Sequence, residues 1–385
     1  MEKSFRMELA GRPLIVETGK MAKQASGAVL VRYGETVVLV TSTASKEARE
    51  GMDFFPLTVD YEEKMYAVGK MPGGFLRREG RPGNSAILNA RLIDRPIRPL
   101  FDKRCRNDIH VMATVLSVDY DNAPELCGML GASASLGISD IPWDGPIAGV
   151  RVGRVDGKFV INPTQEQLKV STLNITVAGS ETAILMVEGG AQEAPEEDVL
   201  DAIMFGHETI KELVAFQKKI IEEVGKLKRT LIFPEIPEEI KTAIYAYAER
   251  PLKEAIFNPD KLTREAHMEE VRKEAETHFK EIYPENGSDI TECLNHLTKE
   301  IVRHMISVDK IRPDGRALDE IRPISCEVGL LPRVHGSALF TRGQTQALTI
   351  TTLAPMSETQ IIDDLTQETE KRYIHQYNFP SYSVG

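Results

Sequence analysis

Cysteine is scarce in this sequence of 385 residues, and its four copies lie far apart. They form no Cys-x-x-Cys pair of the kind that zinc knuckles and redox motifs use, and no disulfide framework can be recognised from their spacing. The sequence therefore argues against a zinc or disulfide scaffold and favours a reducing compartment, so we expect a cytoplasmic protein. The four positions are Cys105, Cys127, Cys293 and Cys326.

Long apolar runs are missing as well. No stretch approaches the roughly 20 apolar residues that span a bilayer, and the first residues, MEKSFRMELAGRPLIVETG, hold none long enough for a signal peptide. We therefore expect no membrane partner. A length of 385 residues exceeds one ordinary core and predicts two or three domains.

Positive charge is in deficit overall: the net charge is −11, which at first argues against nucleic acid as a partner. The deficit is uneven, however. Between Arg77 and Arg106 nine basic residues face three acidic ones, a balance of +6 that leaves −17 for the rest of the chain. Such a basic island can guide a nucleic-acid backbone along one path while the acidic body repels it elsewhere. A solvated charged surface without a partner is the alternative, and composition alone does not separate the two.

The first 230 residues predict an α+β module. Residues 1–60 contain four strand-like runs that break at glycine, and 110–120 is another. The segment SAILNARLIDR has a helical pattern that we expect Pro96 to end, and 125–139 is a small-residue helix suited to close packing on a sheet. Four short strand candidates follow, and then an amphipathic helix from about Glu196 to Lys228 with acidic residues at its start.

Residues 237–308 have a different texture. Glu and Lys are dense, strand-like runs disappear, and apolar residues such as Ile240, Ile244 and Ala248 recur at helical spacing. We expect an all-α linker domain here that acts as a spacer between two folded units.

An internal repeat follows the helical domain. GAVLVRYGETVVLVTSTA at 27–44 matches GSALFTRGQTQALTITTL at 336–353 with a constant offset of 309, so that Gly34 meets Gly343. Both copies predict two strands joined at a Gly-[Glu/Gln]-Thr turn. Gly11-Arg12 precedes the first copy and Gly315-Arg316 precedes the second, which makes a chance match harder to sustain.

A second landmark suggests where the repeat stops. FFPLTVDY at 54–61 has a looser echo in NFPSYSVG at 378–385, and the sequence has no further residues. We therefore interpret 311–385 as the first part of a second module. We expect the isolated chain to be marginally stable or prone to aggregation, because an unfinished module leaves sheet edges uncovered.

Four stretches together resemble the polynucleotide phosphorylase family. They are GGFLRREGRP at 73–82, ARLIDRPIRPLF at 90–101, the run from IRPDGR at 311 to TTL at 353, and YIHQYNFPSYSVG at 373–385. The resemblance covers the whole chain and about the first half of a typical family member. It implies an RNase PH-like (ribosomal protein S5 domain 2-like) βαβ module at 1–230, the all-α linker domain at 237–308, and a truncated second RNase PH-like module at 311–385.

The resemblance also implies an activity. Family members are nucleotidyltransferases that degrade single-stranded RNA from the 3′ end, with inorganic phosphate as co-substrate and Mg²⁺ as cofactor, and release nucleoside diphosphates. They function in mRNA turnover as homotrimers whose six modules form a ring, and can join RNA-degradation complexes with an endoribonuclease and an RNA helicase. The KH and OB-type domains that follow in the family are absent from this sequence.

The family's catalytic residues have no counterpart in the first module. A Ser-Ser-Ser run precedes the Cys-Gly-Ala-Ser helix of the active module, and here Ala123-Pro124-Glu125 stands in its place. Proline removes an N–H donor and glutamate repels phosphate. The family's Asp-x5-Asp-x-Lys set, which holds Mg²⁺, corresponds to Leu168, Asn174 and Thr176, a poor set of ligands for that ion. We therefore expect the first module to be degenerate, and no catalytic or metal-binding residue within this chain.

The first module keeps the residues that grip RNA in the family. Arginines flank a turn rich in glycine (Gly73-Gly74 and Gly80), where guanidinium groups can approach a phosphate backbone. The family has two aromatic residues in this loop, and this chain has Leu76 at the second of them, so base stacking can be looser than usual. The expected RNA-binding residues are Phe75, Arg77, Arg78, Arg81, Arg91, Arg95 and Arg98.

Several alternatives stay open. Arg95 and Arg98 could pair with Asp94 and Asp102 only to fix the chain. The chain could be an RNA-channel and oligomerisation platform without catalysis, as part of a longer enzyme. It could also be a non-catalytic RNA-binding ring or scaffold subunit of the exosome type, although such subunits usually carry a single module.

Overall fold

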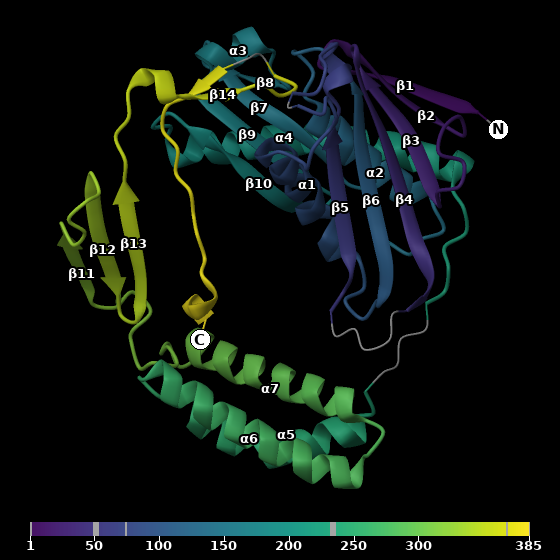
Figure 1. The fold of residues 1–385 in the computed structure, drawn as a ribbon. Coiled ribbons are helices and arrows are strands. Elements are labelled where there is room, and N and C mark those ends of the chain that lie inside the picture. Colours follow the sequence, from purple (N-terminus) through teal and green to yellow (C-terminus); the bar gives the residue numbers. More distant parts are fainter. Residues whose placement is uncertain (1, 49–53, 74, 232–235, 367–368, 385) are drawn as a thin grey trace. The chain divides into compact units, whose positions relative to one another are not determined.

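The structure is a computed structural model, and it describes residues 2–48, 54–73, 75–231, 236–366 and 369–384. The chain forms two compact units: unit 1 comprises Met1–Phe233 with Thr359–Gly385, and unit 2 comprises Pro234–Glu358. Each has its own hydrophobic core. Figure 1 labels the helices and strands of both.

Residues 2–231 of unit 1 form two β-sheets. The larger has the strand order β1-β2-β3-β4-β6-β5 and is antiparallel except for the parallel pair of β5 and β6. The smaller is antiparallel with the order β10-β9-β7-β8. The strands of the larger sheet are β1 (Lys3–Leu9), β2 (Arg12–Thr18), β3 (Gly27–Tyr33), β4 (Thr36–Ala48), β5 (Leu57–Glu63) and β6 (Asn107–Ser117).

The four short strands expected after the small-residue helix are all present and form the smaller sheet. They are β7 (Ala148–Val155), β8 (Lys158–Ile161), β9 (Leu173–Gly179) and β10 (Ile184–Ala191). Helix α3 (Gln165–Val170) follows β8 and begins with a capping box between Thr164 and Gln167. The α+β class predicted for this module is therefore confirmed.

Helix α2 (Pro124–Ile138) packs against β3, β4 and β6 of the larger sheet and against β7 of the smaller one. Every residue from Leu126 to Ile138 is buried. A Cβ atom on Gly131 would lie 2.4 Å from Cγ2 of Val40, so only glycine permits this approach to the sheet. The small residues of this segment thus serve the close packing that they predicted.

Two other helices of unit 1 differ from the expected bounds. Helix α1 (Asn84–Ile97) runs through Pro96 rather than ending there, because the proline lies in the last turn, where only one intrahelical hydrogen bond is lost, and its ring is buried. Helix α4 (Glu196–Val224) ends before Gly225. The residues after it run along the end of α2, where the Nζ atom of Lys228 donates to three carbonyl groups, those of Leu136, Gly137 and Ser139.

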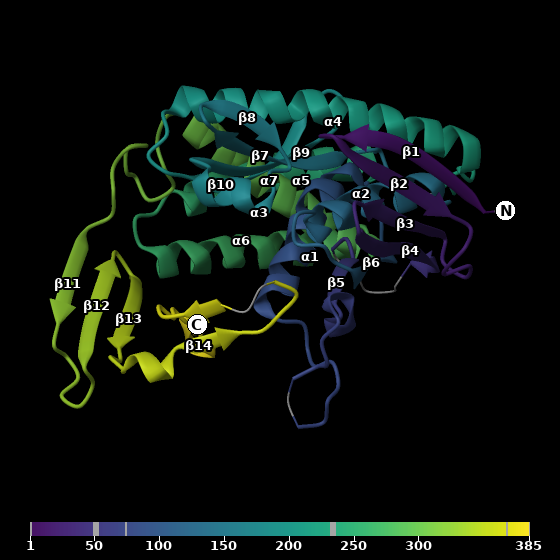
Figure 2. The ribbon, with the colours of Figure 1, turned by 90° about the horizontal axis from the view of Figure 1, so that it is seen from above.

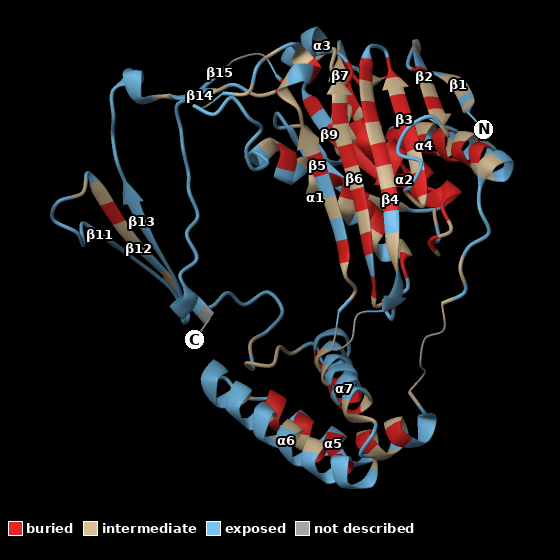
Figure 3. Ribbon diagram, turned by 45° about the vertical axis from the view of Figure 1, so that its right-hand side comes forward, coloured by how far each residue is buried: buried red, intermediate tan, exposed pale blue. Residues whose placement is uncertain are grey.

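Unit 2 begins with three helices, α5 (Glu238–Ile256), α6 (Lys261–Ile282) and α7 (Gly287–Ser307). Their apolar faces form one core, which includes Ile244, Leu252 and Phe279. A three-stranded antiparallel sheet follows, made of β11 (Ile324–Val328), β12 (Gly336–Arg342) and β13 (Thr345–Thr351). All seven residues of β13 are exposed, and Figure 3 shows this strand in the colour of exposed residues.

The internal repeat is visible in the backbone. In the first copy Tyr33 pairs with Thr36 and Gly27 with Ser42. In the second copy Arg342 pairs with Thr345 and Gly336 with Thr351, the same register displaced by 309 residues. The turn glycines also match, since Gly34 has a φ of 60° and Gly343 a φ of 61°, a conformation that side chains other than glycine rarely adopt.

The second landmark of the repeat does not share this structure. Residues 57–63 form β5, which pairs in parallel with β6. Residues 381–384 form the 3₁₀ helix η4 (Ser381–Val384), and no strand in the described part of 378–384 accompanies it. The described residues 378–384 therefore do not share the strand structure of residues 57–63. The remaining elements are η3 (Met356–Glu358) and the paired strands β14 (Gln360–Ile362) and β15 (Thr369–Lys371).

None of the described helices combines the length and the apolar character required to cross a bilayer.

Candidate nucleic-acid interface

The arginine-rich loop connects η1 (Met65–Val68) to α1 and lies in unit 1. Figure 2 shows it in dark blue, projecting away from the sheet. The backbone N–H of Met65 donates to the carboxylate of Glu79 at 2.9 Å, which ties the two arms of the loop together. The loop therefore has an internal fastening even though its tip extends from the fold. Gly74, expected to be part of the glycine turn, lies outside the described residues.

The tip of this loop carries exposed side chains whose polar groups are not bonded to other residues in the described part of the chain. Phe75 is fully exposed and Leu76 is 76% exposed. Arg77, Arg78 and Arg81 are exposed, and none of them has a hydrogen bond or ion pair to another residue in the described part of the chain. A bare phenylalanine ring beside unpaired guanidinium groups is the combination that stacks on bases and binds phosphate groups.

Arg77 has a φ of 49°, in the left-handed region. A side chain other than glycine, asparagine or aspartate adopts this conformation at a cost. The local conformation therefore carries strain at the position where the chain presents two adjacent arginines.

Of the three arginines on α1 and at its C-cap position, one is unpaired and two form ion pairs. Arg91 is exposed and has no partner among the residues that the structure describes. Arg95 forms an ion pair with Glu188 of β10. Arg98 forms one with Asp94 at 2.7 Å and donates to the carbonyl of Leu57 at 2.9 Å.

The alternative in which these arginines fix the chain is thus supported for both paired residues. That alternative named Asp94 and Asp102 as the partners, whereas Arg95 pairs with Glu188 from a strand far along the chain. Asp102 pairs instead with Arg104 at 2.7 Å. Phe75, Arg77, Arg78, Arg81 and Arg91 remain the part of the predicted set whose side chains are uncommitted; we call these five residues the free set.

The segment in place of the serine run begins α2. Ala123 is the N-cap residue and makes no side-chain hydrogen bond to the helix, and Glu125 lies in the first turn. The carboxylate of Glu125 forms an ion pair with Arg151 of β7 at 2.5 Å, and the side chains are only 12% and 20% exposed, respectively. The start of a helix attracts an anion, and here the chain itself supplies one. A bound phosphate would have to displace a nearly buried carboxylate.

Other polar groups lie close to this ion pair. Burial raises the pKa of Glu63, and the negative charges of Asp364 and Glu125 add to the effect, while a hydrogen bond from Ser85 opposes it. The hydroxyl group of Tyr61 is buried and has no hydrogen-bond partner. The carboxylates of Glu63 and Glu125 are unfavourable neighbours for a further anion, such as a phosphate group, at this position.

The counterparts of the magnesium-binding set do not fit a magnesium ion. Leu168 lies on α3, whereas Asn174 and Thr176 lie on β9, where Thr176 is buried. A leucine side chain has no donor atom, and two neutral side chains bind a hard cation poorly. Among the described residues no group of three or more His, Cys, Asp or Glu side chains is arranged to hold a metal ion.

Sequence reasoning missed a contact made by the segment after β14. Lys70, at the start of the arginine-rich loop, forms an ion pair with Asp363 at 2.8 Å and donates to the carbonyl of Asp364 at 3.4 Å. Leu365 is 4% exposed and belongs to the core of unit 1. No pattern in the sequence marks this leucine, because it stands alone in a polar segment.

Comparisons with known proteins decide the family. The model of the 3′ exoribonuclease family, domain 1, matches residues 10–142 and 320–385, which together are more than half of the chain. The chain belongs to this family. Domain 2 of the same family matches residues 145–209, and the polyribonucleotide nucleotidyltransferase RNA binding domain matches residues 239–317. The resemblance and the fold class expected from the sequence are thereby confirmed.

Individual relatives agree with this assignment. The chain is 59% identical to a polyribonucleotide nucleotidyltransferase of Heliobacterium modesticaldum over 99% of its own length and 54% of that protein. It is 58% identical to one of Syntrophomonas wolfei, over 100% of its own length and 54% of that protein. The chain thus spans about half the length of the curated relatives it matches, and it is homologous to their N-terminal half. Rice Rrp46 is a solved structure with a TM-score of 0.43 and 14% identity, over 57% of this chain and 94% of that one.

Proposed function

We propose that this chain supplies RNA contacts to a phosphate-dependent 3′→5′ exoribonuclease and takes no chemical step itself. The observation that carries the proposal is a contrast within unit 1. The free set presents an exposed ring and four uncommitted guanidinium groups, while Glu125 and Arg151 neutralise each other where the family binds phosphate. The side chains that would bind RNA are therefore available, whereas the charged side chains at the position of the family's phosphate site are bound to each other.

The whole protein, on this proposal, degrades single-stranded RNA processively to nucleoside 5′-diphosphates in mRNA turnover. Inorganic phosphate is the co-substrate and Mg²⁺ the cofactor, both held by residues of a longer polypeptide. Kinship with polyribonucleotide nucleotidyltransferases supports this activity. Arg95 and Arg98 stay in the proposed RNA-binding set, and each would exchange its carboxylate partner, Glu188 or Asp94, for a phosphate group of the RNA.

The same kinship supports a cytoplasmic homotrimer that can associate with an endoribonuclease and an RNA helicase in a degradation complex. We further propose that the functional divisions are a first RNase PH-like module at 1–230, a helical linker at 237–308 and the start of a second module at 311–385. The shared register of the two hairpins supports the repeat on which this division rests.

A non-catalytic ring or scaffold subunit of the exosome type is the second candidate. The observation in its favour is the engaged site at Glu125. The helical segment and the second hairpin in the same chain favour the longer enzyme, because ring subunits usually carry one module.

A paired assay tests the proposal. The purified chain is incubated with labelled oligo(A), and binding is measured by fluorescence anisotropy. It is then incubated with poly(A), Mg²⁺ and phosphate, and ADP release is measured, with a full-length relative as positive control. We expect binding without ADP release. Robust ADP release would refute the assignment of a degenerate site, and absence of binding would refute the role in RNA contact.

A further inference from the structure

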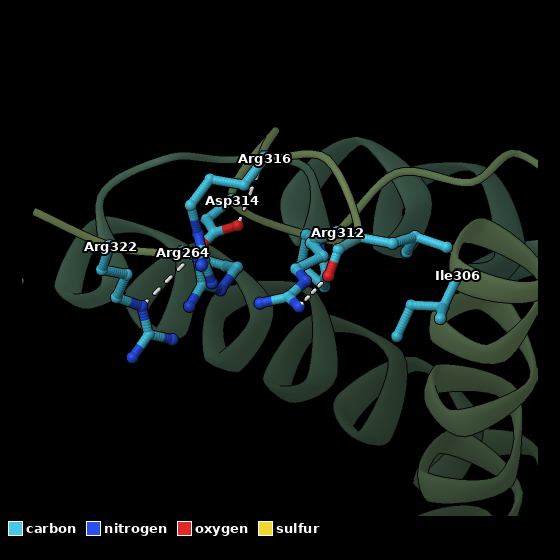
Figure 4. A pocket seen from close by; sticks show the side chains of 8 residues that line it. Arg264, Ile306, Arg312, Asp314, Arg316 and Arg322 are labelled. Atoms are coloured by element: carbon cyan, nitrogen blue, oxygen red, sulfur yellow. Dashed lines mark hydrogen bonds and ion pairs between the residues drawn. The ribbon is translucent and has the colours of Figure 1, made fainter. Parts of the chain in front are cut away.

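Unit 2 contains a cavity of about 590 Å³ that the RNA-binding proposal does not use. Helix α6 contributes Arg264, α7 contributes Ile306, and the segment 312–322 provides the remaining lining. Figure 4 shows four arginine side chains around Asp314, with Ile306 to one side. The volume lies within the range of small-molecule sites, roughly 300–1,000 Å³.

The cavity has a strong excess of positive charge. Its lining includes Arg264, Arg312, Arg316 and Arg322, and Asp314 is the one acidic residue among the lining side chains. Burial acts to raise the pKa of Asp314, but hydrogen bonds from Arg316 and the charges of Arg316 and Arg322 outweigh it and hold that pKa below its usual value. Asp314 is therefore charged near neutral pH, and the lining carries a net charge of +3.

Most of the N–H donors of the four lining arginines are not used in hydrogen bonds to the protein. Arg264 donates to the carbonyl of Asn258 at 2.6 Å, and Arg312 donates to the carbonyl of Leu318. Arg316 donates to Asp314 at 2.9 Å and to the carbonyl of Glu320 at 2.7 Å. Each guanidinium group has five N–H donors, so four groups retain many donors for an anion. Arg322 lies 3.7 Å from the carboxylate of Asp314, which offsets part of the charge of Arg316 and Arg322. The carbonyl acceptors of Arg264 and Arg312 orient those side chains without neutralising their charge.

Three segments hold the lining in place. The N–H of Asn258 donates to the carbonyl of Pro313 at 3.1 Å, which joins the loop before α6 to the segment 312–322. The turn of the β12–β13 hairpin lies against Arg322, because a Cβ atom on Gly343 would be 2.9 Å from Cδ of that side chain. Gln344 of the same turn donates to Asp260, the N-cap residue of α6, at 3.2 Å. These contacts hold the lining in place before a ligand binds, which reduces the entropy lost on binding.

The cavity also has an apolar side. Ile306 and Leu318 are 40% and 38% exposed, and Pro313 completes the apolar part of the lining. A free phosphate ion would leave these surfaces uncovered. A nucleotide would place its phosphate groups on the arginines and its base against the apolar side chains.

We infer that this cavity binds a nucleotide with two or more phosphate groups, at a site separate from the free set. A phosphate monoester carries about −1.5 to −2 charges at neutral pH, and a second phosphate group adds about one more, which matches the net charge of the lining. Two phosphate groups can each accept paired N–H donors from a guanidinium group. The site accordingly favours a nucleoside diphosphate or triphosphate over a monophosphate.

Calorimetric titration of the 385-residue chain with ADP and with AMP tests the inference. We expect ADP to bind, and AMP to bind at least tenfold more weakly. Charge reversal in Arg264→Glu or Arg322→Glu should weaken ADP binding at least tenfold. The matched control is Arg250→Glu on α5, whose side chain is 89% exposed and pairs with Glu254 on the same helix. It should leave ADP binding unchanged.

Further variants separate a loss of the binding site from a loss of the fold. Arg264→Gln and Arg322→Gln remove charge without reversing it, and they should weaken ADP binding with an unchanged thermal melt. Arg77→Glu with Arg78→Glu should leave ADP binding unchanged, because those residues lie outside the cavity. The inference is overturned if the folded chain does not bind ADP, or if the cavity variants bind it as tightly as the original chain. Displacement of ADP by an RNA oligonucleotide without terminal phosphates, dependent on Arg264, would also overturn it and assign the cavity to an RNA strand.

Discussion

Charge reversal at Arg77 and Arg78 should remove about half of the salt dependence of RNA binding. Each phosphate contact on a single strand contributes about 0.7 to the slope of log K against log salt. The free set contains four arginines without a partner in the described part of the chain. If each neutralises one phosphate, the slope is about −3, and affinity falls roughly fifty-fold between 50 and 200 mM salt.

The double variant Arg77→Glu/Arg78→Glu leaves two such contacts. Its slope should be about −1.4, and the fall over the same salt range should be about sevenfold. Affinity at 50 mM salt should drop as well, because two negative charges now face the RNA. The assay is fluorescence anisotropy with a labelled oligo(A) at five salt concentrations.

A second pair of reversals controls for net charge. Lys20→Glu/Lys23→Glu makes the same change on another exposed loop of unit 1, where neither lysine has a partner among the described residues. Its slope should match that of the original chain. Equal slopes for the Arg77/Arg78 variant and the original chain would refute the assignment of these arginines to phosphate contacts.

Three further predictions concern other residues of unit 1. Phe75→Ala should weaken oligo(A) binding by about 1–3 kcal/mol, the contribution of one stacked base, without lowering the thermal melting temperature, because the ring is fully exposed; a lower melting temperature would indicate a structural role. Glu125→Gln should lower the free energy of unfolding in urea by about 1–3 kcal/mol, because it leaves the guanidinium group of Arg151 without its carboxylate, and an unchanged midpoint would contradict this. The hydrogen bond and charge of Arg229 hold the pKa of Asp140 below 3.8. The stability that this ion pair contributes is therefore present above pH 3.8 and is lost as the pH falls through the lowered pKa. Asp140→Asn should be less stable than the original chain at pH 6, and the difference in stability should shrink in acid.

Much of the fold follows from local patterns in the sequence. Strands β2 to β10 of unit 1 and the three helices of unit 2 coincide with runs of β-branched residues or with helical spacing of apolar residues. Strand β1 is missed, because its sequence KSFRMEL holds no β-branched residue. The prediction that Pro96 ends α1 is wrong, because tertiary packing buries the proline in the last turn. The described residues 378–384 form no strand either, and a strand needs a neighbour that sequence patterns alone do not place.

The candidate sites are less accessible to sequence reasoning. The arginine-rich loop can be identified from its composition, but the division between free and paired arginines cannot. The partner of Arg95 is Glu188, which lies on a strand far along the chain. The burial of Leu365 and the cavity around Asp314 likewise depend on segments that meet only after folding. The spacing of residues along one helix or strand predicts which of them share a face, but it does not predict contacts between segments that are distant in the sequence.

The shared register of the two hairpins has a consequence for how the chain folds. A nascent chain contains two strands, β4 and β13, that can pair with β3 in the same register, so exchange between the copies is a hazard during synthesis. Helix α2 can discriminate between them. Gly131 packs on Val31 of β3 and Val40 of β4, and the residue of β13 equivalent to Val40 is Thr349. A hydroxyl group buried under that helix without a partner is unfavourable, so an exchanged strand completes the core less well and the correct partner is favoured.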